Sequence, residues 1–316
     1  MARFRALMGR IPDAAGLVAE MQAAASLLPR KRDAFQADLI ARVFRDAAAV
    51  ASLSGWTGRI VVADGRVLVD QDGALFPADL SNRFFRRGGE PHGAGLLLVL
   101  RRLGLSPRTI FDVGANIGEL SVYFARQLPD ARVVAFEPAP ENIELFRQIQ
   151  ALQQPLLDNL ELVPEAVSDR IGTIPMTVGA GLLNTTMVDG DLGRMRGTPE
   201  ARVIEIPTDT LEHLCRRLKV GTIDFLKLDM EGGEPRLAGA IRALRGRIGA
   251  AYVEISSFNT LEAYLDLIDA FAEAGLAMAD KKRRPVAQPG PWLREKLAAM
   301  GLVNVWFADP ERLRRD

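Results

Sequence analysis

The spacing of apolar positions changes several times along the chain. Residues 14 to 52 place alanine, leucine and charged residues at helical spacing and predict two helices. From Arg59 to Phe76 the pattern changes to β-branched runs separated by Asp64-Gly65 and Asp72-Gly73, two pairs typical of tight turns. This segment is therefore predicted to form a small hairpin or meander. Residues 93 to 105, GAGLLLVLRRLGL, predict a further helix.

From Thr109 onward, short apolar strands alternate with helical segments. Parallel strands need crossover connections, so this alternation predicts an α/β domain with a parallel sheet and helices on both faces. The pattern divides the chain into an N-terminal accessory segment, residues 1–95, and a main domain, residues 96–316. The expected strands are TIFDVG (109–114), RVVAFEP (132–138), LELVPEAV (160–167), IPMTVG (174–179), VIEIPT (203–208), TIDFLKLDM (222–230), AAYVEIS (250–256), LAMAD (276–280) and VNVWFAD (303–309), with a last helix at 260–274.

Composition narrows the class of protein. Lysine plus arginine and aspartate plus glutamate both number 40, and aromatic residues make up 6%, which argues against nucleic acid as a partner. One cysteine excludes an internal disulfide framework, and two histidines leave little for zinc. The N-terminus carries no apolar run of signal-peptide length and no later window could form a transmembrane segment. We therefore expect a cytoplasmic protein.

The stretch FDVGANIGE, residues 111–119, ends the first strand of the main domain, where ligands of open α/β sheets bind. Gly114 and Gly118 allow the chain to turn beneath a ligand, and Glu137, at the end of the next strand, can accept hydrogen bonds from ribose hydroxyls. The loop lacks the G-x-G-x-x-G pattern, and Asp112 would repel a pyrophosphate. A ligand with a ribose and a cationic amino group fits better, and S-adenosylmethionine has both. The alternative for Asp112 is a helix N-cap.

Several motifs, in this order, resemble the FkbM family of S-adenosylmethionine-dependent methyltransferases over roughly residues 107–308. The resemblance implies a Rossmann-like class I methyltransferase fold, with a seven-stranded, mostly parallel sheet and an antiparallel last strand. It also implies O-methylation of a hydroxyl on a sugar, glycan or secondary metabolite. The motifs are FDVGANIGELSVYFA, VVAFEPAPENIELF, AVSD, Asn184-Thr185-Thr186, IPTDTLEHL and FLKLDMEGGE followed by YVEI.

The same resemblance implies a set of cofactor contacts. Glu137 would bind the ribose, while Glu165 and Ala166 would lie at the adenine, although Glu165 could equally be a solvated strand end. Asn184-Thr185-Thr186 would cover the cofactor pocket and contact the acceptor. The residues implied at the methionine end are Asp112, Gly114, Asn116 and Gly118.

Removal of a proton from the acceptor needs a base near the strand ends. The candidates are Asp229 first, then Glu231 and Glu254, because neighbouring carboxylates can raise one another's pKa. The alternative for Glu231 is a purely structural role in holding its turn. The alternative for Lys227 is snorkelling, in which the side-chain stem is buried and the ammonium group reaches water. Asp229 and Glu231 could also bind Mg²⁺ through their oxygens, but two such carboxylates are too common to assign a metal site. His92 is an alternative base.

Two functional hypotheses remain. One is a methyltransferase acting on a small-molecule or glycan acceptor; the other is a catalytically silent Rossmann-like binding or assembly module. A dehydrogenase is opposed by the missing pyrophosphate pattern. The sequence is compatible with a homo-oligomer and does not identify the acceptor. The basic run at 281–285, KKRRP, is predicted to be a solvated loop, with contact to an acidic glycan or lipid headgroup as the alternative.

Overall fold

The computed structural model describes residues 59–63, 66–77, 92–178, 185–186 and 202–314, and the helices predicted within 14–52 lie outside them. The described residues belong to two compact units. One contains the three strands at 59–77 together with residues 92–96 and 149–156, and the other contains the described parts of 97–148 and 157–314.

The smaller unit holds an antiparallel sheet in the order β1-β2-β3, which confirms the predicted meander. Its strands are β1 (Arg59–Ala63), β2 (Arg66–Gln71) and β3 (Ala74–Pro77). Asp72 and Gly73, between β2 and β3, both have positive φ, 49° and 87°, as two-residue hairpin turns of the primed type require. The Asp-Gly pair therefore acts as the sequence predicted.

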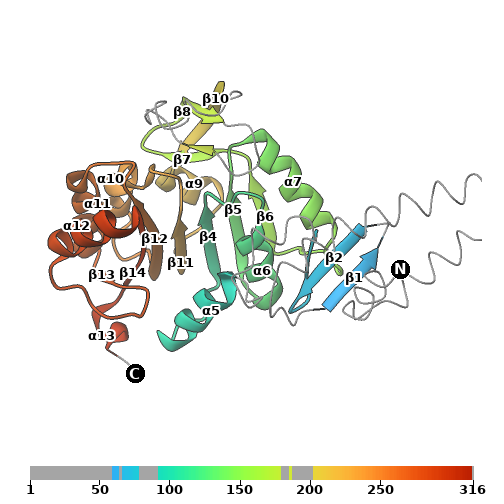
Figure 1. Cartoon of the computed structure of the whole chain (residues 1–316), viewed down its shortest axis with the longest axis horizontal. Coiled ribbons are helices and arrows are strands. Elements are labelled where there is room, and N and C mark those ends of the chain that lie inside the picture. The colour runs from blue at the N-terminus through green and yellow to red at the C-terminus, as the bar shows by residue number, and fades with distance from the viewer. Residues whose placement is uncertain (1–58, 64–65, 78–91, 179–184, 187–201, 315–316) are drawn as a thin grey trace, which may run out of the picture. The chain divides into compact units, whose positions relative to one another are not determined.

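The larger unit is built on a seven-stranded sheet in the order β13-β14-β12-β11-β4-β5-β6 (Figure 1). Neighbouring strands from β12 to β6 run parallel, whereas β14 runs antiparallel to both β12 and β13. The predicted Rossmann-like class I arrangement with an antiparallel last strand is confirmed. The strands are β4 (Thr109–Val113), β5 (Arg132–Phe136), β6 (Leu160–Val163), β11 (Phe225–Leu228), β12 (Ala250–Ser256), β13 (Ala277–Ala279) and β14 (Leu302–Ala308).

Helices cover both faces of this sheet because its central strands are apolar on both sides. All four residues of β11 are buried. On one face, Phe225 packs edge-on against Phe124 of α6, with ring centroids 5.9 Å apart. On the other, Leu226 and Leu228 join a core with side chains of α9, α10 and α11. The helices are α5 (His92–Arg102), α6 (Glu119–Gln127), α7 (Pro140–Ala151), α9 (Leu211–Arg217), η1 (Glu234–Leu237), α10 (Ala238–Ala243), α11 (Leu261–Glu273), α12 (Pro289–Met300) and α13 (Pro310–Leu313).

A second sheet, in the order β7-β10-β8-β9, was not predicted as a separate sheet. The predicted strand 160–167 is in fact split, because Pro164 has no N–H to continue the ladder of β6. Ala166 begins a strand that pairs with Thr208 of β10 instead. The strands are β7 (Ala166–Ser168), β8 (Gly172–Val178), β9 (Thr185–Thr186) and β10 (Arg202–Thr210).

Helix α12 was also missed, and its sequence explains why. Its first turn is Pro-Gly-Pro, which reads as a loop although proline suits the start of a helix, and Leu293 is its one buried residue. None of the helices within the described ranges combines the length and apolar character needed to cross a bilayer.

Candidate functional site

The loop between β4 and α6 packs so closely on its surroundings that two positions require glycine. Gly114 has φ 76°, and a Cβ there would lie 1.7 Å from the backbone oxygen of Asp229. Gly118 has φ 85°, and a Cβ there would lie 2.3 Å from the ring of Phe146. The amides of Gly114 and Ala115 both donate to the carbonyl of Phe136, at 3.0 Å. The glycines therefore bring the loop against the carboxyl ends of β5 and β11.

Glu137, directly after β5, fixes this loop from the side. Its carboxylate accepts hydrogen bonds from the amides of Asn116 (2.8 Å) and Ala139 (3.0 Å) and from Asn142 Nδ2 (3.1 Å). Burial raises its pKa to about 7 even though these donors oppose the rise. A carboxylate offers about four acceptor sites, so one remains for a ligand hydroxyl. The ribose contact of Glu137 stays a prediction, with one acceptor site left for it.

Asn116 is the loop residue with unused hydrogen-bonding capacity. It has φ 53°, in the left-handed region that asparagine tolerates better than most residues. Its side-chain oxygen Oδ1 is buried and has no hydrogen-bond partner within the described part of the chain. A buried acceptor without a partner is costly unless a ligand or water supplies the donor. The position of Asn116 thus fits its predicted contact with a cofactor.

Asp112 lies deeper than the sequence suggested. Its side chain is 0% exposed, and Oδ2 accepts a 2.6 Å hydrogen bond from Ser121 Oγ of α6. The cation beside it is Lys227, whose Nζ lies 3.2 Å from Asp112 Oδ1. Lys227 is itself 5% exposed, so the suggestion that it snorkels is wrong. The charge of Asp112 already has a partner within the protein and does not by itself call for a cationic ligand. Its contact with a cofactor stays a prediction.

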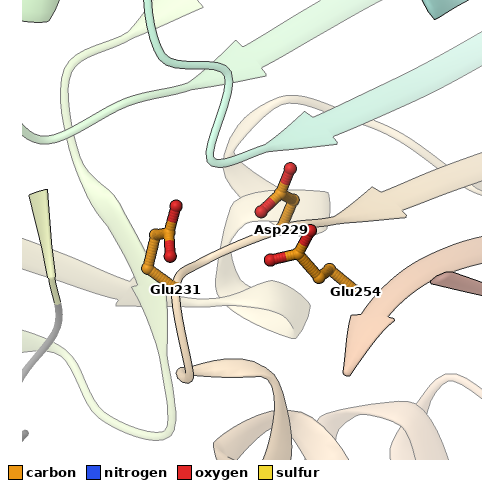
Figure 2. A group of neighbouring side chains, drawn as sticks. All are labelled: Asp229, Glu231 and Glu254. Carbon is orange, nitrogen blue, oxygen red and sulfur yellow. The ribbon is translucent and has the colours of Figure 1, made fainter. Parts of the chain in front are cut away.

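Three carboxylates meet at the carboxyl ends of β11 and β12, as Figure 2 shows for Asp229, Glu231 and Glu254. One oxygen of each lies within 4.8 Å of the others, a spacing that fits oxygen ligands around one divalent cation. Burial and the charge of Asp229 raise the pKa of Glu231 to about 7, and burial, Asp229 and Glu231 raise that of Glu254 to about 8. The structure therefore brings together the three residues that the sequence selected.

Glu234 holds the turn that carries Glu231, and sequence reasoning did not single it out. Its Oε1 accepts from the amides of Met230 (2.6 Å) and Gly232 (3.4 Å), and Oε2 accepts from Tyr264 Oη at 3.3 Å. Glu231 has φ 53°, an unfavourable conformation for glutamate that these contacts on both sides maintain. Burial raises the pKa of Glu234 to about 7. A glutamate three residues after Glu231, in a glycine turn, is the sequence signal that could have identified this role.

The remaining predicted residues are Glu165, Ala166, His92 and Asn184. Glu165 forms a bidentate pair with Arg217, at 2.8 and 3.0 Å, and its adenine contact stays a prediction, as does that of Ala166 in β7. His92 begins α5, but its side chain lies outside the described residues, as does Asn184. Within the basic run, Lys281 and Lys282 are exposed and Arg284 pairs with Asp280.

Comparison with known proteins gives consistent matches. The model of the family described as "Methyltransferase FkbM domain" matches residues 112–277. The chain is 30% identical to "Methyltransferase sdnD" of Sordaria araneosa over 148 residues, which are 40% of this chain and 57% of that protein, less than two thirds of its length. It is 25% identical to "2-O-methyltransferase NoeI" of Sinorhizobium fredii (strain NBRC 101917 / NGR234) over 179 residues, 51% of this chain and 71% of that protein.

Among solved structures, the chain is similar to methyltransferase FkbM from Methylobacillus flagellatus KT. The TM-score is 0.40 and the sequence identity 15%, and the match covers 64% of this chain and 44% of that one.

The close packing of Gly114 predicts a large effect of a single methyl group. Gly114→Ala should lower the free energy of unfolding by about 3 kcal/mol or more, because the new Cβ meets backbone atoms that cannot move aside and φ is positive. Gly239→Ala is the control, because that glycine lies inside α10 with no atom within 4 Å of the new Cβ. Urea denaturation of both variants tests this. Equal stability of the two would contradict the described packing of the loop.

The burial of Glu234 predicts a pH-dependent stability. Its pKa in the folded state is about 7 against an ordinary 4.5, so folding favours the protonated form. The stabilisation that it provides is complete below about pH 4.5 and is lost as the pH rises through about 7. Glu234→Gln should therefore flatten the decrease in unfolding free energy between pH 5 and 8, whereas Glu262→Gln, at an exposed position, should not. An unchanged slope in the Glu234 variant would count against this burial.

Proposed function

The chain belongs to the methyltransferase FkbM domain family, and we propose that it is an S-adenosylmethionine-dependent methyltransferase acting on a hydroxyl group of a small molecule or glycan. The observation that carries this proposal is the meeting of two features at one edge of the sheet. A glycine loop with an unpaired buried acceptor lies at the end of β4, and three carboxylates lie at the ends of the neighbouring strands β11 and β12. O-methylation in particular is supported by the name of the Sinorhizobium fredii relative, a 2-O-methyltransferase.

The loop provides groups that suit each end of the cofactor. Asn116 Oδ1 is available to accept from the α-ammonium group at the methionine end, and Glu137 keeps one acceptor site for a ribose hydroxyl. Gly114 and Gly118 keep the loop free of side chains that would fill this space. When bound, S-adenosylmethionine supplies the methyl group on its sulfonium. Glu165 and Ala166 stay candidates for the adenine end.

The carboxylates act on the acceptor. Methyl transfer to a hydroxyl requires in-line alignment and removal of the hydroxyl proton. Asp229 is held in place by Lys227, 3.4 Å from its Oδ2, and so suits the orientation of the hydroxyl as well as the role of base. Glu231 and Glu254, with pKa values of about 7 and about 8, can take up or share the proton near neutral pH. The rate would then depend on all three side chains.

A divalent cation is the alternative use of the same oxygens. Asp229, Glu231 and Glu254 present hard oxygen ligands of the kind that Mg²⁺ prefers, and a cation would relieve their mutual repulsion. Whether the protein requires Mg²⁺ is decided by the second experiment below. Every proposed cofactor contact lies after residue 95, so the proposed role of residues 1–95 is acceptor selection or assembly. A homo-oligomer is compatible with the sequence.

The cofactor assignment predicts binding of S-adenosylmethionine and S-adenosylhomocysteine but not of NAD. Glu137→Gln should weaken S-adenosylmethionine binding by about 1.5 to 3 kcal/mol, because it weakens both the ribose contact and the hydrogen bond to Asn116 N. Titration calorimetry measures this directly. Glu161→Gln, which changes a half-buried glutamate on β6 that pairs with Arg132, is the matched control and should bind normally. Binding of NAD by the unaltered protein would contradict the assignment.

The acceptor assignment predicts losses of turnover without losses of cofactor. Asp229→Asn and Glu254→Gln should each lower methyl transfer by about 10² to 10⁴, with S-adenosylmethionine affinity nearly unchanged. The assay follows label from S-adenosylmethionine into extracts of the source cells and identifies the fraction that gains it. Normal turnover in both variants would place the base elsewhere, with His92 as the next candidate. Loss of activity on chelation, restored by Mg²⁺, would make the cluster a metal site.

A further inference from the structure

Lys227 is a charged residue in the middle of a buried strand. Its neighbours in β11 are all apolar and buried, and its own side chain is 5% exposed. An ammonium group in such a place is costly unless each N–H has an acceptor. Nζ donates to the carbonyl oxygen of Gly114 at 2.8 Å and lies 3.2 Å from Asp112 Oδ1 and 3.4 Å from Asp229 Oδ2. The ammonium group thus has one hydrogen-bond acceptor and two carboxylate oxygens at ion-pair distance.

The three acceptors come from different parts of the proposed site. Asp112 lies near the end of β4, and its other carboxylate oxygen accepts a hydrogen bond from Ser121 Oγ of α6. Gly114 begins the loop proposed to bind the cofactor. Asp229 follows β11 and belongs to the three carboxylates proposed to bind the acceptor. One side chain therefore contacts both halves of the site.

Neutralising Asp112 would require only one of these contacts. A lysine that served merely as a counter-ion could leave the carbonyl of Gly114 and the carboxylate of Asp229 to other donors or to water. Instead, the β4–β11 register pairs Asp112 with Lys227, and the lysine side chain extends toward the strand ends where Gly114 and Asp229 lie. Burial opposes the charge on Lys227, yet Asp112 and Asp229 raise its pKa above the ordinary value, so the ammonium group stays protonated.

We propose that Lys227 is a positioning residue for methyl transfer, which fixes the Gly114 carbonyl, and with it the cofactor loop, at a set distance from the Asp229 carboxylate. The role in methyl transfer rests on the proposed function, whereas the anchoring of the loop by Lys227 does not. Without Lys227, the loop and Asp229 are no longer held by a common group. Loss of the Lys227 contacts should loosen the loop, weaken cofactor binding and lower turnover.

The test must separate positioning from simple charge balance. Lys227→Met alone leaves Asp112 buried without a counter-ion and should lower the melting temperature of the protein. The informative comparison is therefore between Asp112→Asn and the double variant Asp112→Asn with Lys227→Met, which both lack that unpaired charge. Asp112→Asn with Lys227→Gln is the second double variant, since glutamine keeps two N–H donors. Lys282→Met, at an exposed position, controls for the loss of a lysine.

The first measurement needs no ligand. Hydrogen exchange at the amides of residues 115–118 should be at least about tenfold faster in the Lys227→Met double variant than in Asp112→Asn, because the loop has lost its anchor. The Lys227→Gln double variant should restore part of the protection, because its amide can still donate to the Gly114 carbonyl. Titration calorimetry should then show S-adenosylmethionine affinity about tenfold lower in the Lys227→Met double variant than in Asp112→Asn. With the labelled acceptor fraction, kcat at saturating S-adenosylmethionine should fall by a further factor of about ten or more.

Equal exchange and equal affinity in Asp112→Asn and both double variants would overturn the proposal and reduce Lys227 to a counter-ion. Failure of the proposed function gives a different result. In that case the unaltered protein would bind no S-adenosylmethionine, while the exchange measurement would still report whether Lys227 anchors the loop.

Discussion

A buried ammonium group between two parallel strands is the interaction on which the rest of the site depends. The register of β4 and β11 sets Asp112 opposite Lys227, and both side chains are removed from water. Charges placed so deeply persist only when their partners are held in good geometry. Ser121 of α6 and the carbonyl of Gly114 complete that geometry. The ends of the two strands, and the loop and turn that follow them, are thereby tied to one another.

Around this pair, the site is built from side chains that constrain backbone. Glu137 accepts from the amide of Asn116 on one side of the loop, and Glu234 accepts from the amides of Met230 and Gly232 in the neighbouring turn. Both carboxyl groups are almost fully buried and both have a raised pKa because of that burial. The fold thus uses carboxylates to hold the two segments that would face cofactor and acceptor. Residues that look alike in sequence divide into those that support the site and those that can meet a ligand.

The sequence predicted the seven-stranded sheet well because apolar strands and amphipathic helices alternate clearly from Thr109 onward. It also predicted the turn at Asp72-Gly73, because an Asp-Gly pair adopts the positive φ that such a turn requires. It also selected Asp229, Glu231 and Glu254, since residues at the carboxyl ends of neighbouring parallel strands meet at one edge. It could not show that the partner of Asp112 is Lys227, because that pairing depends on side-chain direction and register. The predicted strand 160–167 ran across Pro164, which in fact separates β6 from β7. Helix α12 was missed because its Pro-Gly-Pro start reads as a loop.

In the proposed function, one edge of the sheet holds the methyl donor and an acceptor-activating cluster side by side. The decisive experiment is a crystal structure of the protein with S-adenosylhomocysteine bound. We expect the amino group of the ligand to lie within hydrogen-bonding distance of Asn116 Oδ1, a ribose hydroxyl to contact Glu137, and the sulfur to face Asp229, Glu231 and Glu254. A ligand bound elsewhere, or one whose sulfur faces away from these carboxylates, would contradict it.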